Sequence, residues 1–193
     1  MSTLPVVLDR VREAGHAIFT AGTYNLNIVG IRTDDDQANT FNDRLCLVYR
    51  DEYGWVTRTW AITTDPGTYW RQHPMRIRGT AIMAPGQYRG SHQLGRHRGR
   101  YPALVQSGGP VRYFRDADRD TILDMEPDTL NEGYVGLNIH RSSSRDGGSD
   151  EVGRWSAGCQ VFQDPDEYEA FISICERSAD TYGNRFTYTL INE

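Results

Sequence analysis

The chain has 193 residues, of which 38% are hydrophobic and 24% are charged, and its formal net charge is −5 with a pI near 5.5. These values are typical of one globular domain with a substantial core, and the acidic balance argues against a general nucleic-acid-binding protein. All 21 basic residues are arginines, which we attribute to a GC-rich coding sequence. No apolar run approaches the ~20 residues of a membrane span. Charges interrupt the N-terminal apolar run at once, so we expect no signal peptide.

The spacing of apolar residues predicts a helix over residues 3–15, a polar loop at 34–39 and many short strands between them and the C-terminal region. The strands are predicted at residues 23–32, 45–49, 55–63, 80–83, 87–92, 103–106, 111–115, 134–140 and 186–191. Residues 142–153 are rich in Ser, Gly and Asp, and we expect a mobile loop over the site. A second helix begins at Asp164, a natural N-cap, and ends at Gly183.

Short strands with a helix at each end predict a mainly β fold, either a sandwich or a partly closed barrel. We expect one catalytic domain. It divides into an N-terminal extension (1–44), a core (45–163) and a C-terminal helix and strand (164–193). Cys46 and Cys175 lie in apolar patterns and are expected to be buried core thiols rather than disulfide partners.

The pattern with the clearest chemistry is a histidine followed by a cysteine. His140 ends an apolar run, and fifteen residues separate it from Ser156-Ala157-Gly158-Cys159. Two neighbouring strands can bring an imidazole base beside a thiol nucleophile, and small residues before the cysteine let the backbone approach a substrate carbonyl. A tight turn around a buried thiol is the structural alternative.

This motif resembles the catalytic motif of the L,D-transpeptidase catalytic domain, in which His precedes Ser/Thr-His-Gly-Cys. Residues 84–88 (Ala-Pro-Gly-Gln-Tyr) are similar to its Thr-Pro-x-Gly-x-Phe/Tyr segment, and residues 62–67 to the strand end and turn before it. The resemblance covers roughly residues 45–161. Much of the chain, including residues 24–30, is also similar to bacteriophage-encoded proteins. Two positions depart from the family: its second histidine is Ala157 here, and Gln160 follows the cysteine.

The resemblance implies an L,D-transpeptidase-like fold and a role for each motif residue. Cys159 would attack a carbonyl carbon to form a thioester, and His140 would take the thiol proton. The backbone carbonyl of Arg141 would orient His140, and the N–H groups of Gly158 and Cys159 would hold the oxyanion. Ser156 would shape the turn or hydrogen-bond the histidine.

Further residues are predicted to bind substrate. Arginines of the basic stretch 90–100 suit the carboxylates of peptidoglycan stem peptides, although a solvated hairpin tip explains the stretch equally well. We expect His92 to approach the thiol and partly replace the missing second histidine. The candidate substrate-binding residues are Tyr88, His92, Arg96, Arg98, Trp155 and Gln160.

The leading hypothesis is a monomeric cysteine enzyme that cleaves or exchanges amide bonds of peptidoglycan stems without a cofactor. It would be a phage lysis enzyme made in the cytoplasm and released to the cell wall in the periplasm. A catalytic Cys159 should then react with iodoacetamide below the pH at which ordinary thiols do. The alternatives are a non-catalytic phage structural or wall-binding protein, a zinc site built from His92, His97, His140, Cys159 and several aspartates, and a nucleic-acid protein using the arginines of 96–100.

Overall fold

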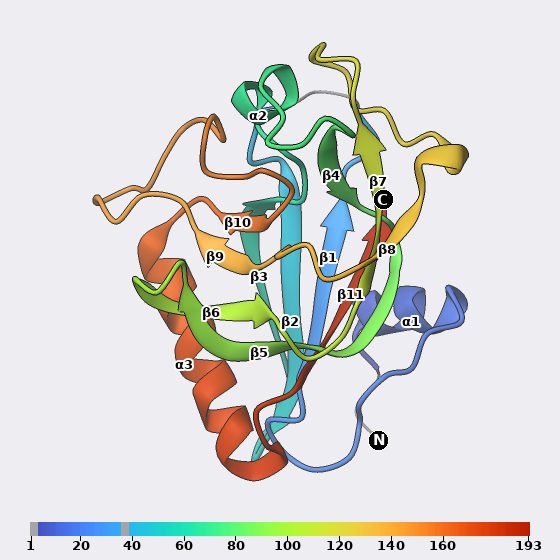
Figure 1. Ribbon diagram of the computed structural model, residues 1–193. Helices are drawn as coiled ribbons and strands as arrows, with labels where there is room; N and C mark the ends of the chain where they lie inside the picture. The colour runs from blue at the N-terminus through green and yellow to red at the C-terminus, as the bar shows by residue number, and fades with distance from the viewer. Residues whose placement is uncertain (1–3, 36–38) are drawn as a thin grey trace.

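Eight strands close into a barrel in the order β1-β11-β5-β6-β9-β10-β3-β2, and three more form a separate sheet in the order β4-β7-β8 (Figure 1). The computed structural model describes residues 4–35 and 39–193. The barrel strands are β1 (Asn27–Arg32), β2 (Asp43–Asp51), β3 (Gly54–Thr63), β5 (Gly86–His97), β6 (Tyr101–Gln106), β9 (Ile139–Arg141), β10 (Gln160–Phe162) and β11 (Phe186–Asn192). The smaller sheet contains β4 (Thr80–Met83), β7 (Val111–Asp116) and β8 (Asn131–Gly133). The predicted mainly β class with flanking helices is confirmed.

Two long hairpins form half of the barrel. β2 and β3 pair along their whole length, from Asp43 with Ile62 to Asp51 with Gly54. β5 and β6 pair as far as His97 with Tyr101, so β5 continues five residues past the predicted end at His92. Polar residues fill this extension, and the sequence therefore lacks the apolar alternation that marks a strand. The arginines of residues 96–100 consequently lie at a hairpin tip.

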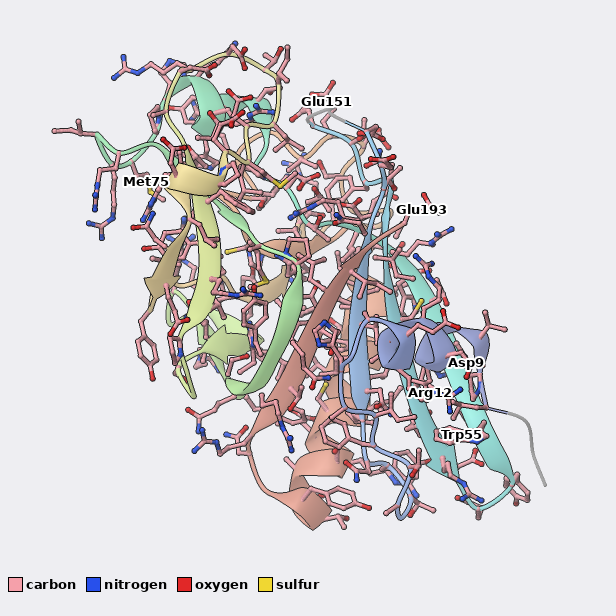
Figure 2. All side chains as sticks on the ribbon, turned by 90° about the vertical axis from the view of Figure 1, so that its right-hand side faces the viewer. Asp9, Arg12, Trp55, Met75, Glu151 and Glu193 are labelled. Carbon is pink, nitrogen blue, oxygen red and sulfur yellow. The ribbon has the colours of Figure 1, made fainter. Side chains whose placement is uncertain are left out.

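The helices cover different sides of the barrel. Helix α1 (Val6–Glu13) buries Leu8 and Val11 and packs its apolar side on the outer face of β1, β2 and β11, as Figure 2 shows. Helix α3 (Pro165–Tyr182) lies against β6, β9 and β10 and shares the main core through Phe171 and Tyr168. Within the described ranges no helix has the length and apolar character needed to cross a membrane.

Helix α3 has the predicted ends. The Asp164 carboxylate accepts hydrogen bonds from the N–H groups of Asp166 and Glu167, at 2.8 and 3.1 Å, and Gly183 follows the last turn at a φ of +79°. Both features satisfy backbone groups that a helix end leaves unpaired. Shorter elements carry too few residues for a pattern and were not predicted, namely helix α2 (Thr68–Gln72), the 3-10 helix η1 (Pro127–Thr129) and β8.

The predicted strand over residues 134–140 is wrong for residues 134–138. There the side chain of Gln106 replaces the neighbouring strand: its Oε1 accepts hydrogen bonds from the N–H groups of Val135, Gly136 and Leu137 at 3.1, 2.8 and 3.2 Å. Gly136 has a φ of +74°, which bends the backbone out of the extended form. This Gln106 cradle holds the segment that leads into β9.

The sequence predicts two loops, and the structure describes one of them fully. The loop at 142–153 is fixed at several points: Ser142 Oγ donates to Gln163 O at 2.7 Å, and Val152 is fully buried with its N–H on Asn39 O at 3.2 Å. These contacts contradict a loop that is free along its length. Of the predicted polar loop at 34–39, residues 36–38 lie outside the described residues, as do residues 1–3.

Replacing Gln106 with Leu should destabilise the fold by about 2 kcal/mol, because three N–H groups lose their acceptor and that of Leu137 is buried. Urea unfolding of the wild type and Gln106→Leu measures this difference. Gln93→Leu is the matched control on the adjacent strand, where the amide bonds with Ser107 and Asn184 at the surface. We expect it to cost under ~1 kcal/mol. Equal losses in the two variants would contradict the cradle.

Candidate active site

Two short parallel strands position the candidate catalytic residues. β9 and β10 pair side by side, Ile139 with Gln160 and His140 with Val161 (Figure 1). Gln160 N–H also donates to Asn138 O at 2.9 Å, which places Cys159 beside Asn138. Because side chains alternate across a sheet, Ile139 points into the core while His140 and Cys159 lie diagonally on the opposite face.

The imidazole of His140 is held in one orientation. Its Nδ1 lies 2.8 Å from Arg141 O, the contact implied by the family resemblance. A carbonyl oxygen only accepts, so Nδ1 carries the proton and Nε2 presents its lone pair. Nε2 is buried and has no hydrogen-bond partner among the described residues. This is the arrangement of a neutral general base.

Two aromatic side chains reinforce that orientation. The Tyr101 hydroxyl donates to Arg141 O at 3.2 Å and lies the same distance from His140 Nδ1. The His97 ring stacks on the His140 ring with centroids 3.9 Å apart. Burial, together with the charge of His97, lowers the pKa of His140 to about 3. The imidazole is therefore neutral throughout the physiological pH range.

The thiol of Cys159 is also held in its neutral form. Only 9% of the residue is exposed, and Sγ donates to Gly136 O at 3.4 Å. Burial raises the pKa of Cys159 to about 11, against smaller lowering effects from the Asn138 N–H and the Arg98 charge. The expectation of a thiol ionised at unusually low pH is therefore contradicted: this environment favours S–H.

The thiol and the imidazole share a face without touching. Among the described residues, Cys159 Sγ bonds to Gly136 O and no hydrogen bond joins it to His140. The separation follows from the register, because Cys159 lies opposite Asn138, two residues before His140.

The turn before Cys159 requires its glycine. Gly158 has a φ of +111°, and a side chain there would place its Cβ 2.1 Å from Ala81 O. Ser156 Oγ donates to Cys159 O at 2.8 Å and accepts from Gly158 N–H at 3.1 Å. Ser156 thus shapes the turn and makes no bond to His140. This bond occupies Gly158 N–H, which corrects its predicted oxyanion role and leaves Cys159 N–H as the backbone donor not engaged by a described residue.

Three predicted substrate-binding residues are structural instead. Tyr88 is buried with its hydroxyl on Ala84 O. Gln160 is buried, and its Oε1 accepts from the Tyr188 hydroxyl at 2.8 Å. His92 is fully buried, with its Nδ1 2.8 Å from Ser91 Oγ and its Nε2 2.9 Å from Leu137 O. Both of its nitrogens are engaged, so His92 does not replace the second histidine.

The other predicted residues lie at the surface. Arg96 closes the β5–β6 hairpin through the carbonyls of Gly99 and Arg100, a structural role. Arg98 sits at the exposed tip of the same hairpin, and its charge lowers the pKa of His97, His140 and Cys159. Trp155 is 44% exposed and lines a surface hollow with Ser143 and Arg145.

A small pocket adjoins the Cys159 turn and was not predicted. Ala157 and Val135 contribute to its wall, and Ala81, Trp70, Arg76 and Arg115 complete it. Ala157, where the resembled family has a histidine, therefore opens onto this space. Arg76 and Arg115 supply positive charge that suits a carboxylate. Nothing in the local sequence around either arginine signals this role, because the pocket is assembled from four separate segments.

The sequence did not predict that Tyr101 and His97 lie beside His140; it indicated His97 only as a ligand of the zinc alternative. They are paired across the β5–β6 hairpin, and their positions beside His140 depend on that hairpin crossing the end of β9. The alternation of β5 would have indicated them only if the strand had been extended past His92.

Comparison with known proteins adds no relative. A scan against models of protein families finds no match, and a search of curated proteins finds no significant one. In the described ranges, the one group of His, Cys, Asp or Glu with metal-binding spacing is Asp116, Asp118 and Asp124. It contains neither the histidines nor the cysteine of the zinc alternative, so the part of the chain that the structure describes does not bring those ligands together at metal-binding spacing.

Alkylation tests the state of Cys159. With its pKa raised to about 11 by burial, the folded thiol should react with iodoacetamide at pH 8 at least tenfold more slowly than free cysteine. Peptide mapping by mass spectrometry follows Cys159 separately from Cys46 and Cys175, and urea-unfolded protein gives the unhindered rate. Modification of folded Cys159 with a midpoint below pH 8.5 would contradict this description of the site.

The buried histidines make stability depend on pH. Burial lowers the pKa of His92 to about 4, so the unfolded chain binds its proton first and stability falls as pH drops from 6.5 towards 4. His92→Asn should reduce that slope by about 1.4 kcal/mol per pH unit. Denaturant unfolding between pH 4.5 and 7 measures it.

The variant and the wild type are compared at each pH, because Asp65 has the opposite effect on stability. Burial raises the pKa of Asp65 to about 6, so its contribution to stability increases as the pH falls. His73→Asn, at an exposed position, is the matched control. An unchanged slope in His92→Asn would show that His92 is not a buried neutral imidazole.

Proposed function

We propose that the chain is a cysteine enzyme that transfers acyl groups from amide bonds. The observation that carries this proposal is the state of His140: Nδ1 is fixed on Arg141 O, and Nε2 is buried, unpartnered and on the same face as Cys159. A buried imidazole nitrogen without a hydrogen-bond partner lowers the stability of the fold, so its presence calls for an explanation. A role as acceptor of the proton of a nearby thiol supplies one.

The chemistry proceeds from a neutral pair. As Cys159 Sγ attacks the carbonyl carbon of the substrate amide, the thiol proton moves to His140 Nε2. The resulting imidazolium returns the proton to the amine nitrogen as the C–N bond breaks, which leaves a thioester. Water or an acceptor amine then attacks the thioester, gives its proton to His140 and releases the thiol. Cys159 N–H is the backbone donor for the oxyanion.

Peptidoglycan stem peptides are the proposed substrate class. Their free carboxylates match the arginines that border the site, Arg98 at the hairpin tip and Arg76 and Arg115 in the adjoining pocket. The His140/Cys159 motif and its resemblance to the L,D-transpeptidase catalytic domain point to the same class and to a fold of that type. A phage lysis enzyme is the corresponding biological role.

The burial of Cys159 favours a second candidate, a wall-binding protein without catalysis. The thiol is occupied by Gly136 O, and Gly158 N–H by Ser156 Oγ. In this case the arginines bind stem carboxylates and the thiol is a packing residue.

The test is mass spectrometry of purified peptidoglycan and defined tetrapeptide muropeptides incubated with the wild type, Cys159→Ala and His140→Gln. The wild type should release stem residues, open crosslinks or exchange added D-amino acids. Cys159→Ala should lose this activity by at least 10³-fold and His140→Gln by at least 10²-fold. Cys46→Ala is the matched control and should keep the activity, because Cys46 lies on the outer face of β2 under helix α1.

Unchanged muropeptides with folded wild type would overturn the enzyme hypothesis, and so would full activity in Cys159→Ala. Sedimentation with insoluble peptidoglycan separates the second candidate: a binding protein should bind whether or not Cys159 is present.

A further inference from the structure

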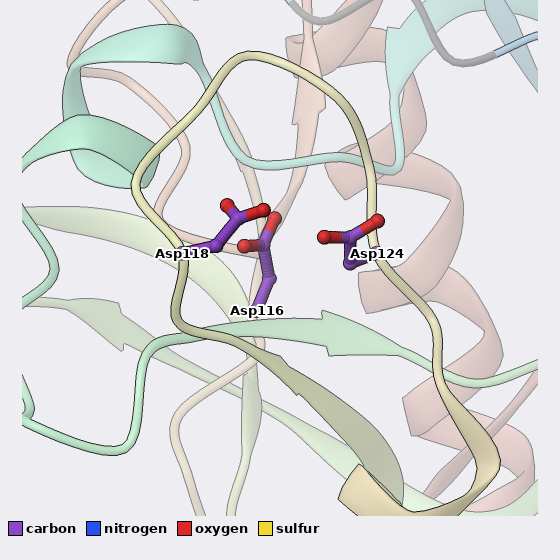
Figure 3. Close-up of side chains that lie close together, drawn as sticks. All are labelled: Asp116, Asp118 and Asp124. Carbon is purple, nitrogen blue, oxygen red and sulfur yellow. The ribbon is translucent and has the colours of Figure 1, made fainter.

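Three carboxylates converge in the loop that follows β7. Asp116 ends that strand, and Asp118 and Asp124 come from the loop that turns back towards it (Figure 3). One carboxylate oxygen of each lies within 4.8 Å of the others. All three belong to a segment of nine residues, so a single loop presents them together.

One of these oxygens is buried without a partner. Asp116 is 1% exposed, and its Oδ2 accepts from Arg71 Nε and Nη2 at 3.2 and 3.0 Å. Its Oδ1 has no hydrogen-bond partner among the described residues. Figure 3 shows the Asp116 carboxyl group pointing between those of Asp118 and Asp124. The Asp116 carboxyl group is therefore directed into the cluster, and a bare buried carboxylate oxygen is costly.

The local charge is strongly negative. Asp120, in the same loop, has an oxygen 3.7 Å from Arg71 Nη2, so this guanidinium pairs with two carboxylates of the loop, those of Asp116 and Asp120. The carboxylates of Asp116, Asp118 and Asp124 lie close enough together to repel one another, and a bound cation would relieve that repulsion.

The loop is shaped for such a cation by a residue outside it. Arg71 of α2 is fully buried and donates to Thr121 O at 2.7 Å as well as to Asp116. It thereby fixes the loop at two points and holds Asp116 so that Oδ1 stays free. Arg71 does not enter the cluster itself, because its nitrogens are committed to Oδ2 and to the carbonyl.

We propose that Asp116, Asp118 and Asp124 form a calcium-binding site. The ligands are all oxygens, which favours a hard cation over the nitrogen- and sulfur-rich sites typical of zinc, and an irregular loop with exposed Asp118 leaves room for the water ligands and flexible geometry that calcium accepts. The site is separate from the candidate active site and does not depend on the proposed function.

The experiment is calorimetric titration of CaCl2 into EDTA-treated, desalted protein, together with its thermal unfolding. The wild type should bind one Ca²⁺ and gain about 5 °C or more in Tm at a hundredfold excess over Kd. Asp118→Asn/Asp124→Asn should bind at least tenfold more weakly, yet melt at or above the wild-type temperature in EDTA because the repulsion is gone. Asp116 is left intact, because its replacement would remove the main ion-pair partner of the buried Arg71.

Asp128→Asn is the matched control, an exposed aspartate outside the cluster, and should bind like the wild type. Absence of binding heat and of a Tm shift at millimolar Ca²⁺ in the wild type would overturn the proposal. Equal weakening in Asp128→Asn would do the same, as would an equal affinity for MgCl2. These measurements follow the folded protein alone, so their result is independent of any activity on peptidoglycan.

Discussion

The candidate site is built on the parallel pairing of β9 and β10, which joins them through only three residue pairs. Two features outside the ladder hold so short a pairing in place. The Gln106 cradle fixes the approach to β9, and Gly158 lets the approach to β10 pass against Ala81 O. Both fix register, and a slip of one residue would turn His140 into the core and Ile139 out of it. The contacts that stabilise the β9–β10 pairing therefore also fix the direction of His140.

Burial sets the chemical character of the site. An ion pair of thiolate and imidazolium needs solvation or strong hydrogen bonds, and at this position burial opposes both charges. The site is therefore organised by the orientation of neutral groups. Arg141 O and the Tyr101 hydroxyl select the tautomer of His140, and His97 covers its ring. In the proposed mechanism, charge develops only as the proton moves from Cys159 to His140, so the transition state gains stabilisation that the resting site lacks.

Local patterns predicted the elements whose signals are local. The cap of α3 and the β2–β3 hairpin were predicted because Asp164 and the turn at Asp51–Gly54 carry their own chemistry. The His140/Cys159 motif and its link to Arg141 O came from resemblance. His97, Arg76 and Arg115 could not be predicted, since their roles depend on how distant segments meet. His92 was misplaced for the same reason: alternation gave its strand, but only the closed barrel shows that it faces inward.

The position of β11 has a consequence for how the chain folds. This last strand in chain order lies between β1 and β5, and it pairs in parallel with β1 from the other end of the sequence. The barrel cannot close until residues far apart in the chain have met, which makes the loop-closure entropy large and folding slow. During synthesis the edge of β1 that pairs with β11 would therefore stay open until the C-terminus is made. An open strand edge promotes aggregation, and barrels built only from hairpins avoid this delay.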